Sequence, residues 1–452
     1  MFPEPIIQWY RTVYPECSDP IALLINAVLF RPPALTTIRV DLSKYVSLNS
    51  ALDEVRSELK SLHQSLVDMT DIGVSGFISK FDAWIDAEKF PEVIFICTRT
   101  PAAEVQCDLP NVIVDKHTGQ AVCRGANVYA PGIITADSFC RYNSQRNLVN
   151  VFVEKTSHFL VGERVRSLEN LVFLGLGIPA TPSREAIMKL KLEKTRNGVP
   201  AVQMLTALFP ITSRSSHFYL QNLPSIVTSR VLFNACKRRD GRVLDACSGY
   251  GGKTKHLSEL FPKAQIVAVE HSRPKVEACE NLLQSSNCTN ITVIKGDVVK
   301  LSQDPFDAIL LDPPCSGIGQ RPIFSSESIE NSSAPWRGEN FSSYQKRLLK
   351  SVCDMLIVGS PLVYSTCTLS PAENEEVVSW ALSNLPLCLE EICVPLQVRR
   401  GIPEPYTSLS FEYAQKCVRF VPEIDYDPSE KHMLMMDSIA FFIACFIKRE
   451  PL

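Results

Sequence analysis

The sequence predicts an α/β protein whose largest part is a Rossmann-like, doubly wound sheet, preceded by a small β-rich module and a mixed α/β N-terminal segment. After Pro200, apolar runs of strand length alternate with helical patterns, which is the arrangement of a parallel sheet with crossover helices. From Cys107 to roughly Asn197, short β-like runs are instead separated by turn residues. A chain of 452 residues is long enough for two or three domains, each with its own core.

Composition indicates an ordinary soluble protein, with 45% hydrophobic and 21% charged residues. No apolar run reaches the length of a membrane span, and the N-terminus lacks the pattern of a secretory signal, so we expect an intracellular protein. The formal net charge of −3 argues against a strongly basic surface, although local basic clusters such as Lys237-Arg238-Arg239 remain. The 16 cysteines include no C-x-x-C pair, which excludes the commonest zinc pattern and favours buried thiols.

Residues 1 to 106 form the predicted α/β segment, which we expect to pack on the C-terminal domain. Asp19-Pro20 has the form of a helix start, with an N-cap residue followed by proline in the first turn. Thr36 to Val40 is β-branched and strand-like, and Ser47 to Leu66 has apolar residues at helical spacing.

Residues 107 to 199 form the predicted β-rich module. Its strand-like runs are Val112–Val114, Gln120–Val122, Asn147–Val153 and Leu171–Leu174. The loop from Arg124 to Ile133 places a cation and an aromatic residue, Tyr129, beside glycine turns. Such a loop could hold a nucleic-acid backbone and stack a base, and an ordinary barrel corner explains the pattern about as well.

The predicted sheet after Pro200 has five strands, and four of them finish at a polar or acidic residue. The first begins at Val243-Leu244. The second, Ile266–Val269, finishes at Glu270, and the third, Ile291–Ile294, finishes near Asp297. The fourth, Ala308–Leu311, finishes at Asp312, and the fifth, Leu362–Tyr364, finishes at Ser365-Thr366. Because ligands of open α/β sheets bind beyond the carboxyl ends of the strands, we expect these residues to line one crevice.

The stretch from Leu244 to Thr254, LDACSGYGGKT, predicts a strand-to-helix turn that cradles a small cofactor. Its glycines let backbone N–H groups approach a ligand, and the following helix N-terminus favours negative groups. A phosphate-binding P-loop would need glycine where the chain has Cys247, and no G-x-G-x-x-G fingerprint is present. The predicted cofactor-binding residues of the loop are Cys247, Ser248, Gly249, Tyr250, Gly251, Gly252 and Lys253.

Two acidic residues extend this cradle. Glu270 ends the second strand, where a carboxylate in nucleoside-binding sheets accepts hydrogen bonds from ribose hydroxyls, and Asp297 would meet a nucleobase edge. The sequence therefore predicts a cofactor that contains a nucleoside.

Two cysteines follow strand ends, Cys315 in DPPCSG and Cys367 in YSTCT, so both thiols should face the same crevice. A reactive thiol needs a stabilised thiolate, which backbone amides or Lys253 could provide. A lone buried cysteine is usually inert, but two at strand ends beside a cofactor loop favour a chemical role.

Three motifs in combination resemble the Nop/Sun (Fmu-like) family of RNA cytosine-5 methyltransferases. They are DACSGYGGKT, DPPCSG, and YSTCT followed by Glu373-Asn374-Glu375. The resemblance runs from about Pro200 to the C-terminus and includes Ser216–Asn222 and Asp437–Phe442. RGANVYAPGI within residues 107 to 199 resembles the PUA domain that one branch inserts before its methyltransferase domain, and PALTTIRV resembles that branch's N-terminal segment.

The resemblance implies a methyltransferase domain over residues 200 to 452, an inserted small β-barrel PUA domain over 107 to 199, and an N-terminal segment over 1 to 106. It implies S-adenosylmethionine as cofactor, bound by the glycine loop with Glu270, Asp297 and Asp312. The implied partner is RNA, and for this branch a cytosine near the acceptor end of tRNA. Neither a membrane nor a metal ion is expected, and we expect a monomeric, cytoplasmic protein.

The resemblance also implies residue roles: Cys367 is the nucleophile, Cys315 assists product release, and Asp312 and Lys253 stabilise and orient the ring. Carbon 5 of cytosine is a poor nucleophile, and thiolate addition at carbon 6 makes an enamine whose carbon 5 can attack a sulfonium methyl. A paired cytosine must first be turned out of the stack. The PUA module, through Arg124 and Tyr129, would hold the nearby RNA end.

Three departures from the family pattern leave other functions open. The family loop is usually CAAPGGK, and here Tyr250 replaces its proline; Glu270 stands where aspartate is commoner; and Glu154–Phe159 replaces a lysine-rich stretch of the PUA domain. One alternative is therefore a catalytically weak or inactive RNA-binding homologue. Another is methylation of a protein or a small molecule by the same sheet.

Overall fold

The computed structural model describes residues 11, 33, 35–70, 82–97, 109–123, 125–137, 148–154, 171–180, 200–204, 217–301, 304–322, 340–421, 431, 435 and 437–450, with backbone only for 44 and 62–70. The predicted helix start at Asp19-Pro20, the predicted RNA contact Arg124 and the segment after Glu154 lie outside these residues. The chain divides into a C-terminal unit (residues 221–321 and 326–452, with 1–29) and an N-terminal unit (residues 30–220, with 322–325).

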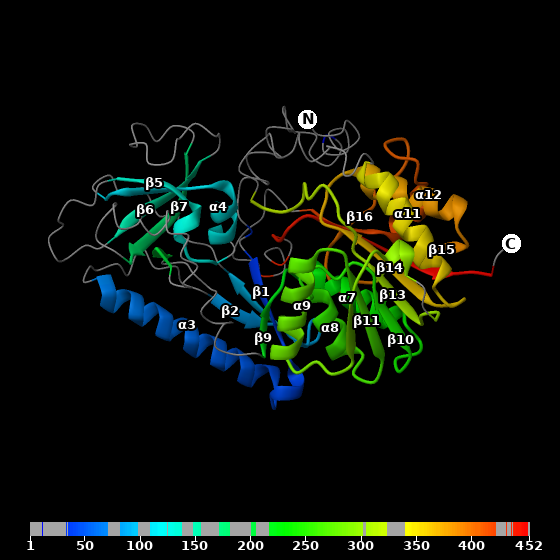
Figure 1. Cartoon of the computed structure of the whole chain (residues 1–452), viewed down its shortest axis with the longest axis horizontal. Coiled ribbons are helices and arrows are strands. Elements are labelled where there is room, and N and C mark those ends of the chain that lie inside the picture. Colours follow the sequence, from blue (N-terminus) through cyan, green and yellow to red (C-terminus); the bar gives the residue numbers. More distant parts are fainter. Residues whose placement is uncertain are drawn as a thin grey trace. The chain divides into compact units, whose positions relative to one another are not determined.

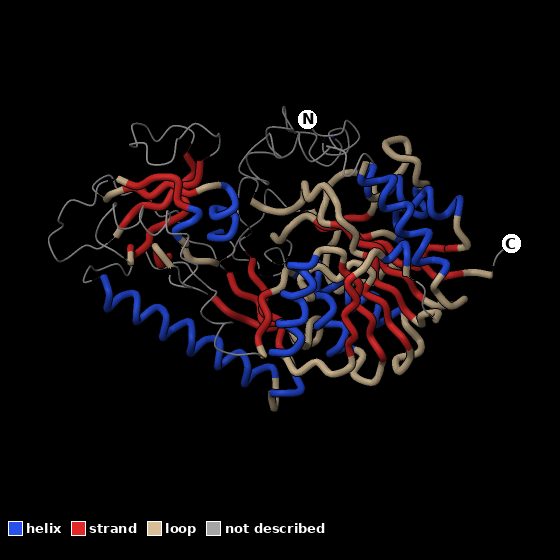
Figure 2. Tube along the Cα trace, viewed as in Figure 1, coloured by secondary structure: helices blue, strands red, loops and turns tan. Residues whose placement is uncertain are grey.

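The C-terminal unit is built on a sheet that, within the described residues, has nine strands (Figures 1 and 2). They are β10 (Arg242–Asp245), β11 (Gln265–Glu270), β12 (Ile291–Lys295), β13 (Ala308–Leu311), β14 (Pro361–Thr366), β15 (Leu387–Glu390), β16 (Arg399–Arg400), β17 (Val418–Phe420) and β18 (Phe441–Lys448). Their order is β12-β11-β10-β13-β14-β18-β17-β16, with β15 also paired to β18. Strands β10 to β14 are parallel and β18 is antiparallel to β14.

This sheet confirms the Rossmann-like alternation predicted after Pro200. The chain runs from β10 outward to β11 and β12, and then returns to the other side of β10 for β13 and β14. The strand order therefore reverses between β10 and β13, which is where open α/β sheets bind ligands beyond the carboxyl ends of their strands. The glycine loop and both cysteine motifs follow strands at this edge.

Helices cover the sheet and begin at residues suited to capping. They are α7 (Leu223–Ala235), α8 (Gly252–Leu260), α9 (Arg273–Ser285), α11 (Phe341–Asp354), α12 (Glu375–Asn384) and α13 (Phe411–Lys416), with short 3-10 turns η5 (Val298–Lys300) and η6 (Pro371–Glu373). Asn222 and Asn340 accept backbone hydrogen bonds at the starts of α7 and α11, which satisfies donors that the helices leave unpaired. Buried residues of α11 and α12 share one core cluster with the sheet residues Leu244, Ile309 and Leu362.

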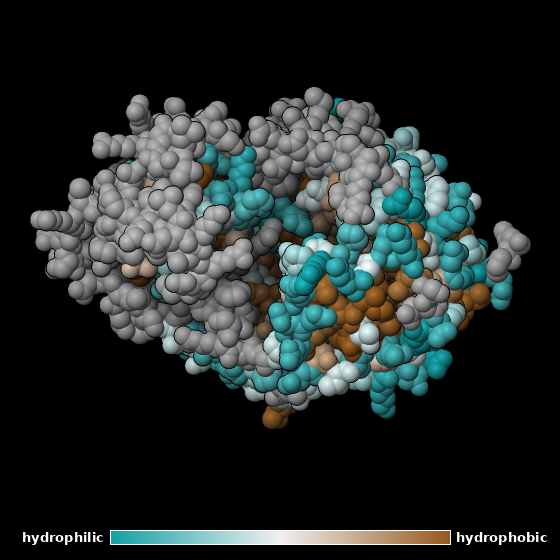
Figure 3. Space-filling model, viewed as in Figure 1, coloured by the Kyte–Doolittle hydropathy of each residue, from teal (hydrophilic) through white to brown (hydrophobic). Residues whose placement is uncertain are grey.

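Strand β12 forms one edge of this sheet and is only partly covered, since none of its five residues is fully buried. Hydrophobic residues gather over this side of the C-terminal unit in Figure 3. In the part of the chain that the structure describes, no helix is long and apolar enough to cross a membrane.

The N-terminal unit contains one described sheet of four antiparallel strands in the order β2-β3-β1-β9. They are β1 (Leu35–Val40), β2 (Asp82–Ile85), β3 (Val93–Cys97) and β9 (Phe218–Leu220), with the turn η2 (Leu42–Lys44) after β1. Helix α3 (Leu48–Thr70) buries Leu52, Val55 and Leu59 in a cluster with this sheet. The strand predicted at Thr36–Val40 and the helix predicted from Ser47 are confirmed.

A second described sheet of the N-terminal unit has five strands in the order β5-β4-β6-β7-β8. They are β4 (Asn111–Val114), β5 (Ile133–Ala136), β6 (Val149–Glu154), β7 (Leu171–Pro179) and β8 (Val202–Met204), with α4 (Lys116–Cys123) and η4 (Ala130–Gly132) between β4 and β5. The strand predicted at Gln120–Val122 is wrong, because these residues lie in α4. Asp115 accepts the backbone N–H of Thr118 and caps that helix. A run of three residues is too short to show whether its apolar residues follow the period of a helix or of a strand.

Strand pairing carries the N-terminal unit past the predicted boundary at residue 199. Strand β8 pairs with β7, and β9 pairs with β1, so the chain enters the C-terminal unit only after Leu220. These partners are far away in the sequence, and no composition change marks the boundary.

Candidate active site

The glycine loop between β10 and α8 depends on two glycines with left-handed backbone angles. Gly249 has φ 56° and Gly251 has φ 86°, a region that other residues adopt only with strain. A Cβ atom at Gly251 would lie 2.7 Å from the Cys279 sulfur, whereas one at Gly249 would meet nothing within 4 Å. The loop is therefore packed tightly against α9 at Gly251 and is open at Gly249.

The predicted acidic residues stand beside this loop at the ends of neighbouring strands. One Glu270 oxygen accepts the Gly249 backbone N–H at 3.0 Å and the other accepts that of Ser272 at 2.7 Å. Asp297, after β12, accepts the Val299 backbone N–H at 3.1 Å. A carboxylate has about four lone-pair sites, so these bonds leave capacity for hydroxyl or amine donors of a ligand.

Sequence reasoning assigned no role to Asp245, which lies at the centre of this arrangement. Its side chain is buried, and one oxygen accepts the Thr254 hydroxyl at 2.7 Å, which ties β10 to the first turns of α8. Burial raises the pKa of Asp245 to about 6, and the Thr254 hydrogen bond and the Lys253 charge only partly oppose this. Burial likewise raises the pKa of Cys247, which keeps that thiol neutral.

Tyr250 points out of the loop, with 65% of its surface exposed. The Lys275 ammonium lies 5.8 Å from the centroid of its ring, within reach of a weak cation–π contact. The family proline is therefore replaced by a side chain at the surface, and the glycine geometry beneath it is kept.

Lys253 and Asp312 form an ion pair that joins the glycine loop to the end of β13. The Lys253 ammonium lies 2.6 Å from one Asp312 oxygen, and the Ser365 hydroxyl donates to the other at 2.7 Å. Burial acts to lower the pKa of Lys253, but the Asp312 carboxylate outweighs it and the pKa is raised. The lysine is thus a permanent cation at this place.

The two predicted cysteines are brought together. The sulfur atoms of Cys315 and Cys367 are 3.2 Å apart, and the Gln320 carboxamide nitrogen is also 3.2 Å from the Cys367 sulfur. The hydrogen bond from Cys315 lowers the pKa of Cys367, against the opposing effects of burial and Asp312. The same contact and burial raise the pKa of Cys315. Cys367 is therefore the more readily ionised thiol of the pair, and Cys315 is the one that holds its proton more strongly.

The geometry agrees with comparisons to known proteins. A family model described as 16S rRNA methyltransferase RsmB/F matches residues 235–399. The tRNA (cytosine(72)-C(5))-methyltransferase NSUN6 of Homo sapiens is 29% identical over 93% of this chain and 90% of its own length. The tRNA (cytosine(72)-C(5))-methyltransferase of Pyrococcus horikoshii is 28% identical over 65% of this chain and 70% of its length. Residues 235–399 therefore match the RsmB/F, or Nop/Sun, methyltransferase family, and the relatives that match nearly the whole chain are tRNA cytosine-5 methyltransferases.

The fold of the chain also matches a solved structure over its whole length. The crystal structure of NSun6 from Pyrococcus horikoshii with SFG gives a TM-score of 0.68 at 24% identity, covering 100% of this chain and 99% of that one. The mixed α/β fold is therefore confirmed. The family resemblance inferred from the sequence motifs is confirmed by the family model and the NSUN6 relatives.

The two loops that carry Cys315 and Cys367 are held together by side-chain hydrogen bonds. The Glu373 carboxylate accepts the Ser316 backbone N–H at 3.0 Å and the Gln345 carboxamide N–H at 3.0 Å, and Gln345 also donates to the Pro314 carbonyl. The Ser316 and Thr368 hydroxyls lie 2.7 Å apart. Glu373 belongs to a motif that the sequence marked as typical of the family, but its bridging position was not predicted.

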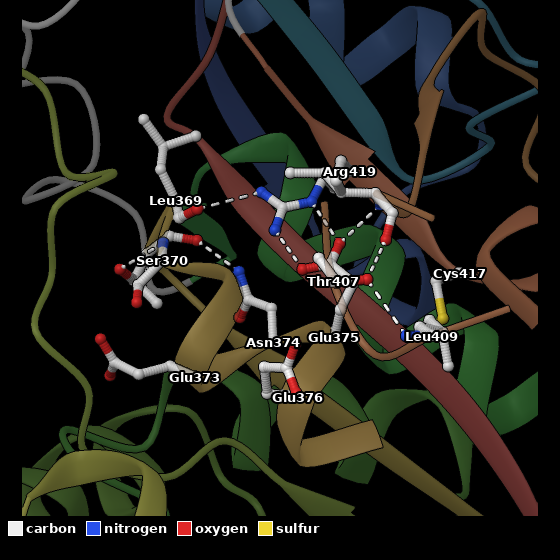
Figure 4. Close-up of polar contacts among 12 residues, drawn as sticks. Leu369, Ser370, Glu373, Asn374, Glu375, Glu376, Thr407, Leu409, Cys417 and Arg419 are labelled. Atoms are coloured by element: carbon white, nitrogen blue, oxygen red, sulfur yellow. Dashed lines mark hydrogen bonds and ion pairs between the residues drawn. The ribbon is translucent and has the colours of Figure 1, made fainter. Parts of the chain in front are cut away.

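A buried ion pair stabilises the backbone that follows Cys367. Arg419 donates from Nε and Nη2 to the two Glu375 oxygens at 2.6 and 2.5 Å, and both side chains are almost fully buried. Figure 4 shows the same guanidinium reaching the Leu369 carbonyl, a contact of 3.3 Å. Asn374 adds a bond to the Thr368 carbonyl at 3.0 Å. The backbone just after Cys367 is thereby anchored to α12 and β17.

Of the predicted RNA contacts, only Tyr129 is described. It precedes η4 in the N-terminal unit and is 41% exposed, so its ring is accessible to a base. Among the described residues, no cluster of three or more His, Cys, Asp or Glu side chains could hold a metal ion.

Proposed function

We propose that this protein transfers a methyl group from S-adenosylmethionine to carbon 5 of a cytosine in tRNA, through a covalent adduct with Cys367. The observation that carries the proposal is the pair of thiols 3.2 Å apart beside the Lys253–Asp312 ion pair. The names of the relatives in Homo sapiens and Pyrococcus horikoshii support tRNA as the substrate. Because those names specify cytosine 72, we propose a cytosine near the acceptor end of the tRNA as the target.

The residues of the C-terminal unit fit S-adenosylmethionine, which supplies an electrophilic sulfonium methyl when bound. The open space above Gly249 lets a ligand approach the loop backbone, and Glu270 and Asp297 offer carboxylate oxygens to hydroxyl and amine donors. The residues proposed to hold it are Cys247 to Lys253, Glu270, Asp297 and Asp312. Its amino-acid carboxylate suits the N-terminus of α8.

Cys367 is the proposed nucleophile because it is the thiol whose pKa is lowered. Its thiolate would add to carbon 6 of the cytosine, and the electron pair of the 5,6 double bond would become available at carbon 5 for methyl transfer. Lys253 and Asp312, held in one ion pair, would contact and orient the ring. A cytosine in a stem must leave the stack to reach this crevice.

Cys315 is proposed to assist the release step, and its surroundings suggest when it can do so. The contact with Cys367 is the largest cause of its raised pKa. Once the Cys367 sulfur is bonded to carbon 6 it is neutral, so Cys315 can lose its proton more readily. As a base, or through one, it would take the proton from carbon 5, and the Cys367 thiolate would then leave from carbon 6.

We also propose that the five-stranded module of the N-terminal unit is a PUA domain that holds the RNA. The RGANVYAPGI loop, the exposed ring of Tyr129 and the small sheet support this assignment. Its proposed extent is residues 107 to 199 with the addition of β8. Residues 1 to 106 are the proposed N-terminal segment, and the methyltransferase domain is proposed to follow.

The experiment that tests the function incubates the purified protein with S-adenosylmethionine labelled in its methyl group and with separate tRNA, rRNA and protein fractions. The expected result is label in tRNA, located at carbon 5 of cytosine by nuclease digestion and mass spectrometry. Label confined to the rRNA or protein fraction would overturn the proposal. RNA and cofactor binding without any transfer would instead support an inactive RNA-binding homologue, the alternative that Tyr250 raised in the sequence.

A further inference from the structure

Gln320 stands beside the reactive sulfur although no motif marked it. Its carboxamide nitrogen is 3.2 Å from the Cys367 sulfur, and its own backbone N–H donates to the Gly317 carbonyl at 2.9 Å across a tight turn. Gly317, the first residue of this turn, has φ 71°, a left-handed angle that glycine adopts without strain. The side chain therefore sits at the end of a defined turn that leads from the Cys315 loop to the Cys367 sulfur.

The backbone on either side of Gln320 is fixed. The Gly319 N–H donates to the carbonyl of Cys367 itself at 3.0 Å, and the Gly319 carbonyl accepts the Ala440 N–H at 2.9 Å. A Cβ atom at Gly319 would lie 2.5 Å from the Ala440 carbonyl oxygen, so only glycine permits this approach. On the other side, Arg321 is 3% exposed and forms an ion pair with Asp437.

The charges around the sulfur explain what such a donor could do. Cys315 is the thiol that donates to Cys367, Lys253 is the nearby cation, and Asp312 is the anion that opposes the thiolate. In the proposed reaction Cys315 loses its proton before it acts as the base and gains one from carbon 5 as Cys367 leaves, so its hydrogen bond to the Cys367 sulfur is not constant through the cycle. A carboxamide does not titrate, and its N–H remains available in both steps.

We propose that Gln320 is a further catalytic residue, whose carboxamide donates a hydrogen bond to the Cys367 sulfur and stabilises its negative charge during both addition and elimination. This inference rests on the proposed role of Cys367 as the nucleophile. Hydrogen bonds to the charged form of a group favour that form, and hydrogen bonds to ionised acceptors are stronger than neutral ones.

The test uses two substitutions of nearly the same size. Gln320→Met keeps the length of the side chain and removes the donor, and Gln320→Glu places a carboxylate beside the thiolate. Gln265→Glu is the matched control, because Gln265 is exposed at the start of β11 in the same unit. Each full-length protein is assayed for the pH dependence of Cys367 alkylation by iodoacetamide, read by peptide mass spectrometry, and for kcat and KM in tRNA methylation.

For Gln320→Met we expect the alkylation midpoint to move to higher pH and kcat to fall by about three- to tenfold, with KM little changed. The shift should be larger for Gln320→Glu and absent for Gln265→Glu. If Gln320→Met leaves both the alkylation midpoint and kcat at wild-type values while Cys367→Ala is inactive, this inference is wrong and the proposed function stands. If Cys367→Ala methylates as well as the wild type, the proposed nucleophile itself is wrong.

Discussion

The sulfur of Cys367 lies 3.2 Å from the sulfur of Cys315, and the pKa values of the two thiols move in opposite directions. The hydrogen bond between them is the largest cause of both effects, since it favours a thiolate on Cys367 and a proton on Cys315. Two cysteines that are alike in the sequence therefore differ in how readily they ionise, which supports the proposed roles of Cys367 as nucleophile and Cys315 as proton donor.

This division of roles predicts different outcomes for the two alanine variants. Cys367→Ala removes the sulfur that would bond to carbon 6, so no methyl transfer and no covalent complex with RNA are expected. Cys315→Ala leaves the nucleophile but slows the release step, so a covalent protein–RNA complex should accumulate. Denaturing gel electrophoresis after incubation with tRNA and S-adenosylmethionine distinguishes the two. Accumulation of the complex in Cys367→Ala in place of Cys315→Ala would reverse the assignment.

Asp245 predicts an unusual dependence of stability on pH. Its pKa is raised to about 6 in the folded protein, above the ordinary value near 3.8, because burial disfavours the charged form. Between these two values the folded state binds more protons than the unfolded state, so this residue makes stability fall as pH rises. The loss is complete above about pH 6 and amounts to roughly 3 kcal/mol from the size of the shift.

Asp245→Asn removes the titration and keeps the shape of the side chain. We expect the variant and the wild type to unfold at similar urea concentrations below about pH 3.8, and the variant to become the more stable of the two as the pH rises above about 6. The measurement is urea unfolding of the cofactor-free protein across this range. A constant difference between the two proteins at every pH would show that Asp245 does not titrate in this window.

The strands β10 to β14 and the glycine loop could be predicted from the sequence because their signals are local. Each strand is a short apolar run that ends at an acidic or polar residue, and Gly249 and Gly251 mark the turn that follows β10. The same is true of the placement of Cys315 and Cys367, since both follow strand ends that meet at one edge of a parallel sheet.

What the sequence did not reveal depends on partners that are distant along the chain. Gln320 and Cys367 are brought together by the pairing of Gly319 with two other segments, and Glu375 meets Arg419 from a different element. Strand β9, near the C-terminal end of the N-terminal unit in the sequence, pairs with β1 near its start. Neither periodicity nor composition encodes such pairings, and a single arginine in a short strand carries no sign of its partner.

The two left-handed glycines of the cofactor loop provide a matched pair of substitutions. Gly249→Ala introduces only the strain of a left-handed backbone, about 1–2 kcal/mol, because its Cβ atom meets nothing within 4 Å. Gly251→Ala carries the same strain and also places its Cβ atom 2.7 Å from the Cys279 sulfur. Thermal unfolding should therefore show a greater loss for Gly251→Ala. Equal losses would mean that α9 can move away without cost.

The Glu375–Arg419 pair predicts a large loss of stability when one partner is removed. Glu375→Gln leaves the Arg419 guanidinium buried without its countercharge, and the free energy of unfolding should fall by about 3–5 kcal/mol. The double variant Glu375→Gln with Arg419→Met removes the uncompensated charge, so its loss should be smaller than the sum of the two single losses. Urea unfolding of all three variants measures this coupling.

An exposed pair provides the control for this prediction. Arg273 and Glu277 on α9 lie 2.9 Å apart, but their side chains are 75% and 59% exposed. Glu277→Gln should therefore cost less than about 1 kcal/mol. Because Arg419 also holds the Leu369 carbonyl, folded Glu375→Gln protein should lose kcat as the Cys367 loop loses its anchor, whereas Glu277→Gln should not. If the two glutamine variants lost equal stability, the buried pair would contribute no more than a surface one, and the anchoring role of Glu375 would have to be given up.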